Sequence, residues 1–457
     1  MQRLKFSFLD KASNYKILLF VWLVLFSFST LTRAKDNSVS NVSELQHALS
    51  SIKQGDTLKL KPGLYKGQFI ITKSIKLVCE QGAIFDGAGS GNALTLSAPD
   101  IQIRQCEVIN WGDDLTLMNA GIYVTHKASN VLIENNRLKG DSFGILLDDV
   151  DGAKVYRNKV EGNLKIRSQD RGNGIHLYNN RSADIAYNVI WHTRDGIYIE
   201  TSNGNKLRHN EMHDLRYGIH YMYSYNNLVQ GNYTHHTRTG YALMQSKFLK
   251  VLDNRSDGDQ NYGMLLNFVT RSTFSGNRMM NVQQGVDPGG QRLIQGAEGK
   301  ALFVYNSLYN EFSHNSFENS GIGIHLTAGS EDNTFFNNQF INNQRQVKYV
   351  ATRRQEWSHE GIGNYWSDYM GWDRDDNGIG DTWYEPNDSM DKLLWKYPSA
   401  RLLMNSPAIQ LLKAIQSEFP VLKSPGVRDS YPLMNPLKTA QSIKSSTNAN
   451  AAVANRK

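Results

Sequence analysis

A repeat of 22 residues is the feature that most restricts what this 457-residue chain can fold into. A glycine followed by an apolar residue recurs at Gly121, Gly144, Gly174, Gly196, Gly218, Gly240, Gly263 and Gly323, with steps of 22 residues in the middle of the series. A second series with mostly the same spacing consists of Asn136, Asn158, Asn188, Asn210, Asn232, Asn254, Asn277, Asn315 and Asn337. Both series lengthen at the same two places, which insertions around residues 163–172 and 284–299 explain. A fixed period of this length indicates a solenoid.

The residues within each repeat favour strands over the pattern of a leucine-rich repeat. Short alternating runs such as Gly196–Glu200 are bounded by Asn, Gly and Asp, which is typical of a strand, a turn and a further strand. Asparagine at a turn tolerates a left-handed backbone and bonds to neighbouring main chain, so stacked asparagines would satisfy one another along the solenoid axis. The sequence therefore predicts an all-β fold, a right-handed parallel β-helix with rungs of about 22 residues.

Both ends of such a solenoid need a cover, because open ends expose strand edges. Helical spacing predicts an N-terminal capping helix over Val42–Ile52, and the β-helix with this cap is expected to span residues 35–350. We expect residues 351–437 to form an irregular and helical C-terminal extension that caps the other end and docks a partner. That extension includes a predicted helix over Ser406–Glu418. Residues 438–457 are predicted to be disordered because they contain little apolar surface.

The first 34 residues have the features of an export signal. A basic stretch that ends at Lys16 is followed by Ile17–Leu31, which carries no charge, and Ala34 suits a cleavage site. The uncharged run is short for a membrane span, although an uncleaved anchor remains an alternative. In either case the body of the protein is expected to function outside the cytoplasm.

Charge and cysteine content exclude some classes of protein. The formal charge is +7, but residues 1–34 and 438–457 contribute +4 each, so residues 35–437 carry −1. Nucleic-acid binding needs a basic surface, and we therefore exclude that class. Two cysteines, Cys79 and Cys106, exclude a disulfide scaffold and a zinc site built from four cysteines. They leave open a single disulfide or two small buried hydrophobic side chains.

Histidine and methionine crowd onto the central repeats. Seven of the twelve histidines and six of the twelve methionines lie between residues 176 and 280. The first and third residues after each repeated glycine are apolar, so the second and fourth are expected to face solvent. Imidazole with thioether favours copper(I) over zinc or magnesium. The predicted copper ligands are His220, Met222, Met244, Glu200 and His176, with ordinary packing as the alternative.

Three arginines, Arg194, Arg216 and Arg238, also recur at intervals of 22 residues. Three like charges in one column would repel one another unless they are paired. We expect Asp195 and Asp214 to pair with them, and an anionic ligand is the alternative.

A second candidate metal site lies near the C-terminus. Its oxygen-bearing side chains resemble the first nine positions of a calcium-binding loop, and they belong to Asp373, Asp375, Asn377 and Asp381. Position twelve of such a loop would be Tyr384 instead of Glu. A structural calcium site and a hydrogen-bonded turn without metal both fit this pattern.

Three sequence segments carry a resemblance to a known family. They are Gly363–Tyr369 (GNYWSDY), Gly371–Asp381 (GWDRDDNGIGD) and Ser424–Met434 (SPGVRDSYPLM). With the β-helix repeats and the His and Met content, they make nearly the whole mature chain resemble the NosD family of nitrous oxide reductase maturation proteins. The first two segments are also found in other carbohydrate-binding and sugar-hydrolase-like β-helices.

The resemblance implies a periplasmic protein that helps to assemble the copper sulfide centre of nitrous oxide reductase. It also implies several partners, namely an ABC transporter permease and ATPase, nitrous oxide reductase and a periplasmic copper chaperone. Membrane association would then be peripheral, through the transporter. The family supplies no ligand motif that can be transferred to this chain, so the copper candidates rest on rung geometry.

Two other functions remain open at this stage. A polysaccharide lyase or epimerase would need clustered carboxylates, for which the candidates are Asp148, Asp149, Asp151 and Glu200. A carbohydrate-binding module would use the exposed rings of Tyr123, Tyr178 and Tyr198. The sequence shows no dense acidic groove, so a non-enzymatic factor that handles copper is preferred. Whether its cargo is copper, sulfur or neither is left open.

Overall fold

The computed structural model describes residues 36–283, 299–327, 329–350, 353–387, 406–407, 411 and 426–437. The predicted export signal over 1–34 and the predicted tail over 438–457 lie outside these residues. The helix predicted over 406–418 also lies largely outside them. Among the described residues, no helical segment has the length and hydropathy of a membrane span.

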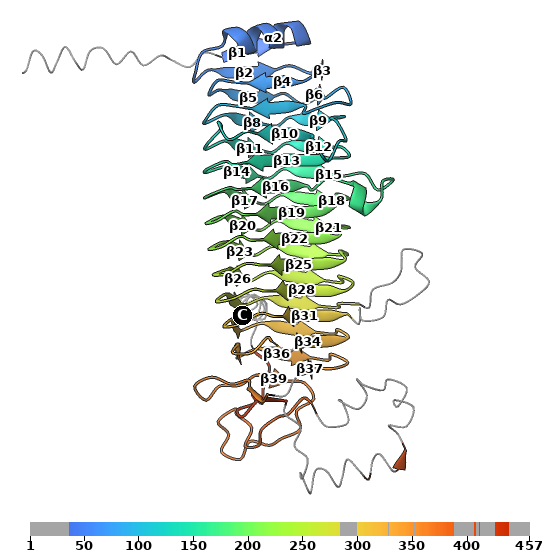
Figure 1. Cartoon of the computed structure of the whole chain (residues 1–457), viewed down its shortest axis with the longest axis vertical. Helices are drawn as coiled ribbons and strands as arrows, with labels where there is room; N and C mark the ends of the chain where they lie inside the picture. The colour runs from blue at the N-terminus through green and yellow to red at the C-terminus, as the bar shows by residue number, and fades with distance from the viewer. Residues whose placement is uncertain are drawn as a thin grey trace, which may run out of the picture.

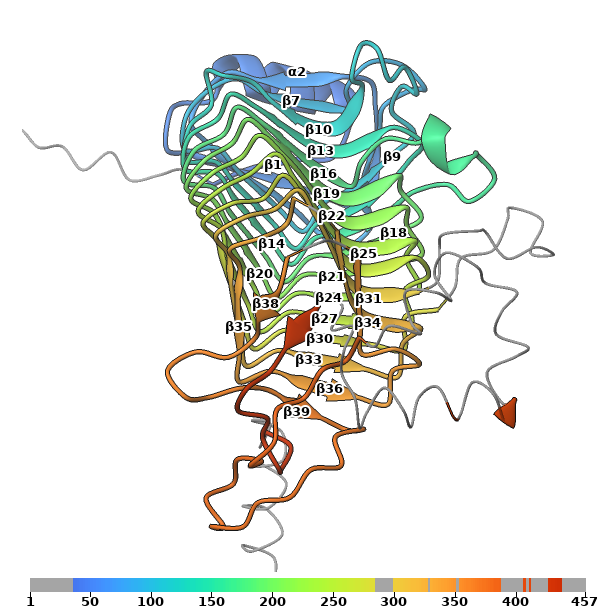
Figure 2. The ribbon, with the colours of Figure 1, turned by 60° about the horizontal axis from the view of Figure 1, so that its bottom comes forward.

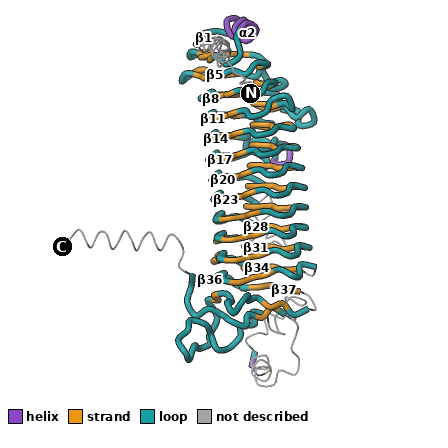
Figure 3. Tube along the Cα trace, turned by 90° about the vertical axis from the view of Figure 1, so that its left-hand side faces the viewer, coloured by secondary structure: helices purple, strands orange, loops and turns teal. Residues whose placement is uncertain are grey.

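The described chain is a solenoid of parallel strands, as the repeat predicts (Figure 1). Successive strands belong in turn to three sheets, which we call A, B and C, and each strand pairs with its counterparts on the neighbouring rungs. Figure 2 shows the three sheets as separate faces around the solenoid axis, and Figure 3 shows the rungs stacked along it.

Sheet A has thirteen strands and begins before the capping helix. In spatial order its strands are β1 (Asp36–Val39), β2 (Thr57–Leu60), β5 (Lys76–Cys79), β8 (Gln102–Arg104), β11 (Leu132–Glu134), β14 (Lys154–Tyr156), β17 (Asp184–Ala186), β20 (Lys206–Arg208), β23 (Leu228–Gln230), β26 (Lys250–Leu252), β29 (Thr273–Ser275), β32 (Glu311–Ser313) and β35 (Thr334–Phe336).

Sheet B also has thirteen strands. They are β3 (Gly63–Lys66), β6 (Ala83–Asp86), β9 (Glu107–Ile109), β12 (Arg137–Lys139), β15 (Lys159–Glu161), β18 (Val189–Trp191), β21 (Glu211–His213), β24 (Tyr233–His235), β27 (Arg255–Asp257), β30 (Arg278–Met280), β33 (Ser316–Glu318), β36 (Gln339–Ile341) and β39 (Tyr365–Trp366).

Sheet C has twelve strands and carries the repeated glycines. They are β4 (Phe69–Ile71), β7 (Leu94–Leu96), β10 (Ala120–Val124), β13 (Phe143–Asp148), β16 (Ile175–Tyr178), β19 (Asp195–Glu200), β22 (Tyr217–Met222), β25 (Thr239–Met244), β28 (Tyr262–Asn267), β31 (Lys300–Tyr305), β34 (Ile322–Thr327) and β37 (Val347–Val350). A Cβ atom on Gly196 would lie 2.5 Å from the Gly218 carbonyl oxygen, so close approach of the rungs requires glycine there.

The asparagine series forms a buried ladder inside the turn between sheets A and B. In a typical step, Oδ1 of Asn210 accepts from the backbone N–H of Asn188 at 3.0 Å and from its Nδ2 at 2.9 Å. Nδ2 of Asn188 also donates to the carbonyl oxygen of Val155 at 2.9 Å. The ladder continues to Asn364, and its members are at most 3% exposed.

The prediction of Asn337 as a member of the ladder is wrong by one residue. The buried ladder position is Asn338, whereas Asn337 adopts a left-handed conformation with φ of 53° and its side chain bonds to His314. The step from Asn315 to Asn338 contains 23 residues, so a strict 22-residue period selects the neighbour.

The N-terminal cover is α2 (Val42–Ser51), within the predicted range. Oδ1 of Asn41 accepts from the backbone N–H of Glu44 at 2.9 Å, and the Glu44 carboxylate accepts from the N–H of Ser40 at 2.8 Å. The first bond satisfies an amide that the first turn of a helix leaves free, and the second ties the residue before the N-cap to that turn. Leu45 is fully buried against the solenoid, while α2 covers the end of the stack (Figure 1).

The C-terminal extension is irregular where it is described, and it closes the other end of the solenoid. Its short strands β38 (Gln355–Glu356) and β40 (Val427–Arg428) pair with each other. The buried carboxylate of Asp429 accepts from the N–H of Asn364 at 2.7 Å and from Nε1 of Trp366 at 2.8 Å. The ladder therefore ends on a carboxylate, and two of the segments that resemble the NosD family meet there.

The two cysteines form a disulfide between Cys79 and Cys106, which decides between the two alternatives that the sequence left open. Such bonds persist in oxidising compartments, so the disulfide agrees with a protein that functions outside the cytoplasm.

The ladder predicts a large stability difference between two adjacent asparagines. Asn338→Ala would leave the buried N–H of Asn315 and the carbonyl of Phe312 without their side-chain partner. We expect it to lower the free energy of unfolding by about 2–4 kcal/mol. The matched control Asn337→Gly suits the left-handed backbone and should cost about 1 kcal/mol or less. Urea denaturation followed by circular dichroism measures both, and equal losses would contradict the ladder assignment.

Candidate metal centre

The outer face of sheet C brings most of the predicted copper ligands onto adjacent rungs. The strand register aligns Glu200 with Met222 and Met222 with Met244, so these three side chains form one column. A parallel column, two residues earlier in each strand, contains His176, Tyr198 and His220. His220 and Met222 lie two residues apart on β22 and face the same side of the sheet, so His220 lies beside the column of methionines.

His220 is held in place by a buried carboxylate. Its Nδ1 lies 3.0 Å from Oδ2 of Asp195, whose side chain is only 2% exposed. Arg216 donates to both oxygens of Asp195, from Nε at 2.8 Å and from its terminal nitrogen at 2.6 Å. Burial by itself would raise the pKa of Asp195, but the hydrogen bonds from His220 and Arg216 outweigh it and hold that pKa below its usual range.

This arrangement selects one ring nitrogen of His220 for a ligand. A carboxylate that accepts from Nδ1–H keeps the lone pair on Nε2, as in the carboxylate–histidine pairs that orient metal ligands. Within the described part of the chain, Nε2 of His220 has no hydrogen-bond partner. The side chain is 13% exposed, so the imidazole is fixed but can be reached from solvent.

The two methionines complete a soft set of donors. Met222 and Met244 end β22 and β25 and are both half-buried, so their thioethers are accessible at the surface. Glu200, on the preceding rung, accepts from the hydroxyl of Tyr198 at 3.2 Å. The side chains present therefore fit a soft monovalent ion, although no group of three His, Cys, Asp or Glu residues is preassembled for a metal within the described residues.

The expectation that His176 faces solvent is wrong. Its side chain projects from the outer face of β16, but the residue is only 6% exposed because the rings of Phe143 and Tyr198 pack over it at 5.4 and 4.8 Å. Both of its ring nitrogens are buried and have no hydrogen-bond partner among the residues that the structure describes. Burial lowers the pKa of His176 to about 4, so the side chain is neutral at pH 7. Wide aromatic rings on adjacent rungs cover this position, which strand alternation does not reveal.

The arginine column is paired differently from the expectation. Asp195 does pair with Arg216, as predicted. Asp214 instead accepts from Nδ1 of His213 at 2.7 Å. Nε of Arg194 is buried, and no described residue bonds to it. The sequence also did not identify Asp195 as the residue that orients His220. One signal was available, because Asp195 is a carboxylate that directly precedes a repeated glycine, whereas each of the other repeated glycines follows an uncharged residue.

The candidate calcium loop uses its oxygens for its own backbone. Oδ2 of Asp373 accepts from the N–H of Gly378 at 2.7 Å, and Oδ2 of Asp381 accepts from the N–H of Arg374 at 2.8 Å. Oδ1 of Asn377 accepts from Ile379 at 2.8 Å, and its Nδ2 donates to Asp375 at 2.9 Å. This geometry favours the hydrogen-bonded turn over a calcium site.

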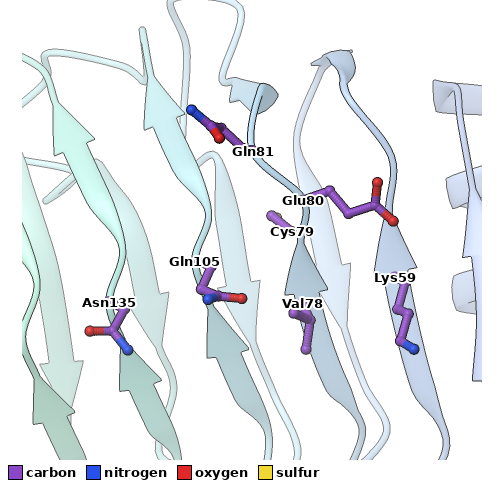
Figure 4. A pocket seen from close by; sticks show the side chains of 7 residues that line it. All are labelled: Lys59, Val78, Cys79, Glu80, Gln81, Gln105 and Asn135. Carbon is purple, nitrogen blue, oxygen red and sulfur yellow. The ribbon is translucent and has the colours of Figure 1, made fainter.

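A hollow near the N-terminal end does not offer a comparable set of donors (Figure 4). It is lined by Lys59, Val78, Cys79, Glu80, Gln81, Gln105 and Asn135. The cysteine among these is in the disulfide, and none of the lining residues is a histidine or a methionine. The hollow therefore lacks free donors for a soft ion.

Known proteins resemble this chain in both sequence and fold. Residues 157–371 match the family described as "Periplasmic copper-binding protein (NosD)". A "Probable ABC transporter binding protein NosD" from Stutzerimonas stutzeri is 58% identical over 376 residues, which cover 82% of this chain and 86% of that protein. A protein of the same description from Pseudomonas aeruginosa PAO1 is 60% identical over 375 residues, covering 82% and 87% of the two chains.

Solved structures that resemble the model share its fold at low sequence identity. The A-module of mannuronan C-5 epimerase AlgE6 from Azotobacter vinelandii has a TM-score of 0.53 at 13% identity and covers 72% of this chain and 94% of that one. A family 28 exopolygalacturonase from Yersinia enterocolitica has a TM-score of 0.51 at 11% identity, with coverage of 73% and 78%. These two structures share the parallel β-helix fold with this chain.

The buried histidine predicts a pH dependence of stability. The unfolded chain takes up a proton on His176 below about pH 6.5, whereas the folded chain does so only near pH 4. Stability should therefore fall by roughly 3 kcal/mol as the pH is lowered through this window. His176→Leu should remove this component, because leucine fits the apolar rings and does not titrate. Urea midpoints between pH 7.5 and 4.5 measure the difference, and an equally steep decline in the variant would refute the assignment.

Proposed function

The chain belongs to the NosD family, and from this we propose that it is a periplasmic accessory factor that handles copper for the maturation of nitrous oxide reductase. The identity of about three residues in five over most of the chain carries the family assignment. The family description supports the periplasmic location and copper binding. In this proposal the protein is not an enzyme, and copper is its cargo.

The structural observation that supports copper handling is the donor set at His220. Asp195 orients the imidazole so that Nε2 is available, and Met222 and Met244 supply two thioethers on adjacent rungs. These three ligands are uncharged, so a bound copper(I) ion keeps its positive charge and can be passed on to a site with anionic ligands. Glu200 provides a carboxylate at the edge of the set.

The proposed partners follow from the family. Relatives are described as ABC transporter binding proteins, which supports docking to a transporter permease and ATPase and a peripheral position at the membrane. We assign this docking to residues 351–437, whose described part lies at the end of the solenoid opposite α2. A periplasmic copper chaperone would deliver the ion, and nitrous oxide reductase would receive it. Residues 1–34 would direct export.

The copper assignment is tested by titrating the full-length chain with copper(I) under reducing conditions. The triple variant His220→Ala, Met222→Ala and Met244→Ala should lose one bound copper per chain, because it lacks the soft donors. Asp195→Asn should weaken binding by about tenfold, since it removes the carboxylate that orients His220. Melting temperatures recorded in parallel show whether each variant remains folded.

The matched control is His209→Ala with Met280→Ala, which removes one histidine and one methionine from outside the site. It should leave copper binding unchanged. Unaltered stoichiometry and affinity in the triple variant would refute the site. Absence of copper binding in the natural chain, with turnover of an acidic polysaccharide, would favour a lyase or epimerase instead.

A further inference from the structure

Large aromatic side chains project from the turn between sheets C and A, or from the strand end that leads into it, on four successive rungs. They are between 42% and 54% exposed, and we call the group Tyr223, Phe248, Phe268, Tyr305 and Tyr309 the aromatic ridge. The ridge begins immediately after Met222, and Phe248 lies four residues after Met244. Apolar rings gathered in this way on a surface indicate an interaction site.

The backbone conformation at the ridge indicates that these rings do not stabilise the fold. Tyr223, Phe248, Phe268 and Tyr309 have φ between 50° and 60°. Bulky side chains strain this left-handed conformation, which asparagine and glycine adopt readily. The left-handed positions in the other turns between sheets C and A, and elsewhere in the same turns, have polar residues or glycine, among them Asn179, Thr201, Gly204, Asn226, Gln245, Arg271, Asn306 and Gly329. Aromatic side chains at these positions combine a strained backbone with exposed apolar surface, which favours a role at the surface.

The ridge is also basic. Lys247 lies 5.8 Å from the ring centre of Phe248, and Arg271 lies 5.6 Å from that of Tyr309. The turn segments 222–228, 244–250 and 267–273 contain no aspartate or glutamate. Neither Lys247 nor Arg271 forms an ion pair with the described residues. A partner that presents carboxylates would supply the missing countercharge.

We propose that the aromatic ridge binds an acidic protein surface and holds it beside Met222 and Met244 during transfer of the ion. This inference rests on the proposed function, because it assigns the partner-binding surface of the same site. Aromatic rings with arginine are typical of the centres of protein interfaces. The rings of Phe268 and Tyr305 are perpendicular, at 88°, and two of the five rings lack a hydroxyl, which favours protein side chains over flat sugar rings.

The test measures binding of the full-length chain to the purified copper chaperone and to apo nitrous oxide reductase by calorimetry. Two double variants are compared with the natural chain, Phe248→Asn with Tyr309→Asn and Lys247→Glu with Arg271→Glu. Each should weaken binding of one of the two proteins at least tenfold and leave copper(I) affinity unchanged. The asparagine variant should not lower the melting temperature, because asparagine accepts the left-handed backbone.

The matched control is Tyr187→Asn, at an aromatic residue that is 48% exposed with φ of 59° but lies on the turn between sheets A and B. It should leave partner binding unchanged. Binding that is equal in the ridge variants and the natural chain would overturn the proposal, as would binding of neither protein to the natural chain. A lowered melting temperature in the asparagine variant would assign the rings to folding. Ridge-dependent binding of polygalacturonate, with no protein binding, would replace the acidic protein with an acidic glycan.

Discussion

Side-chain amides that hydrogen-bond along the solenoid axis are the interaction on which the rest of the structure depends. Each buried asparagine of the ladder accepts from the rung before it and donates to a carbonyl of that rung, so the turn between sheets A and B is satisfied without water. Unpaired amides at this depth would destabilise every rung. The ladder therefore holds the rungs in one register, and this register decides which side chains share a column on the outer faces.

The candidate metal centre is a consequence of that register. Glu200, Met222 and Met244 are 22 residues apart in the chain and adjacent in space only because the rungs stack without slippage. Asp195 reaches His220 on the next rung by the same stacking. A shift of one residue would turn these side chains to the opposite face of the sheet. The scaffold thus contributes to chemistry by holding side chains that a flexible chain could not align.

Much of this could be predicted from the repeat. Its period and its turn residues predict the parallel β-helix and the columns of the outer face, and helical spacing before the first repeat predicts the capping helix. The error at Asn337 arose because one rung is a residue longer than the period. The error at His176 arose because alternation predicts the direction of a side chain and not what covers it. Phe143 precedes the repeated glycine of its strand, outside the pattern of alternation, and its ring still packs over the histidine.

The sequence by itself determined the period, the strand pattern and the set of residues available on each rung, because these depend on spacing along one chain. The tertiary structure decided which side chains contact one another. It joined Cys79 to Cys106 and placed Asp195 where it orients His220. It also paired Asp214 with His213 instead of an arginine. It gave aromatic residues on four successive rungs a left-handed backbone and exposed their rings. These contacts depend on the distances between rungs and on the burial of side chains, and neither can be obtained from the order of the residues alone.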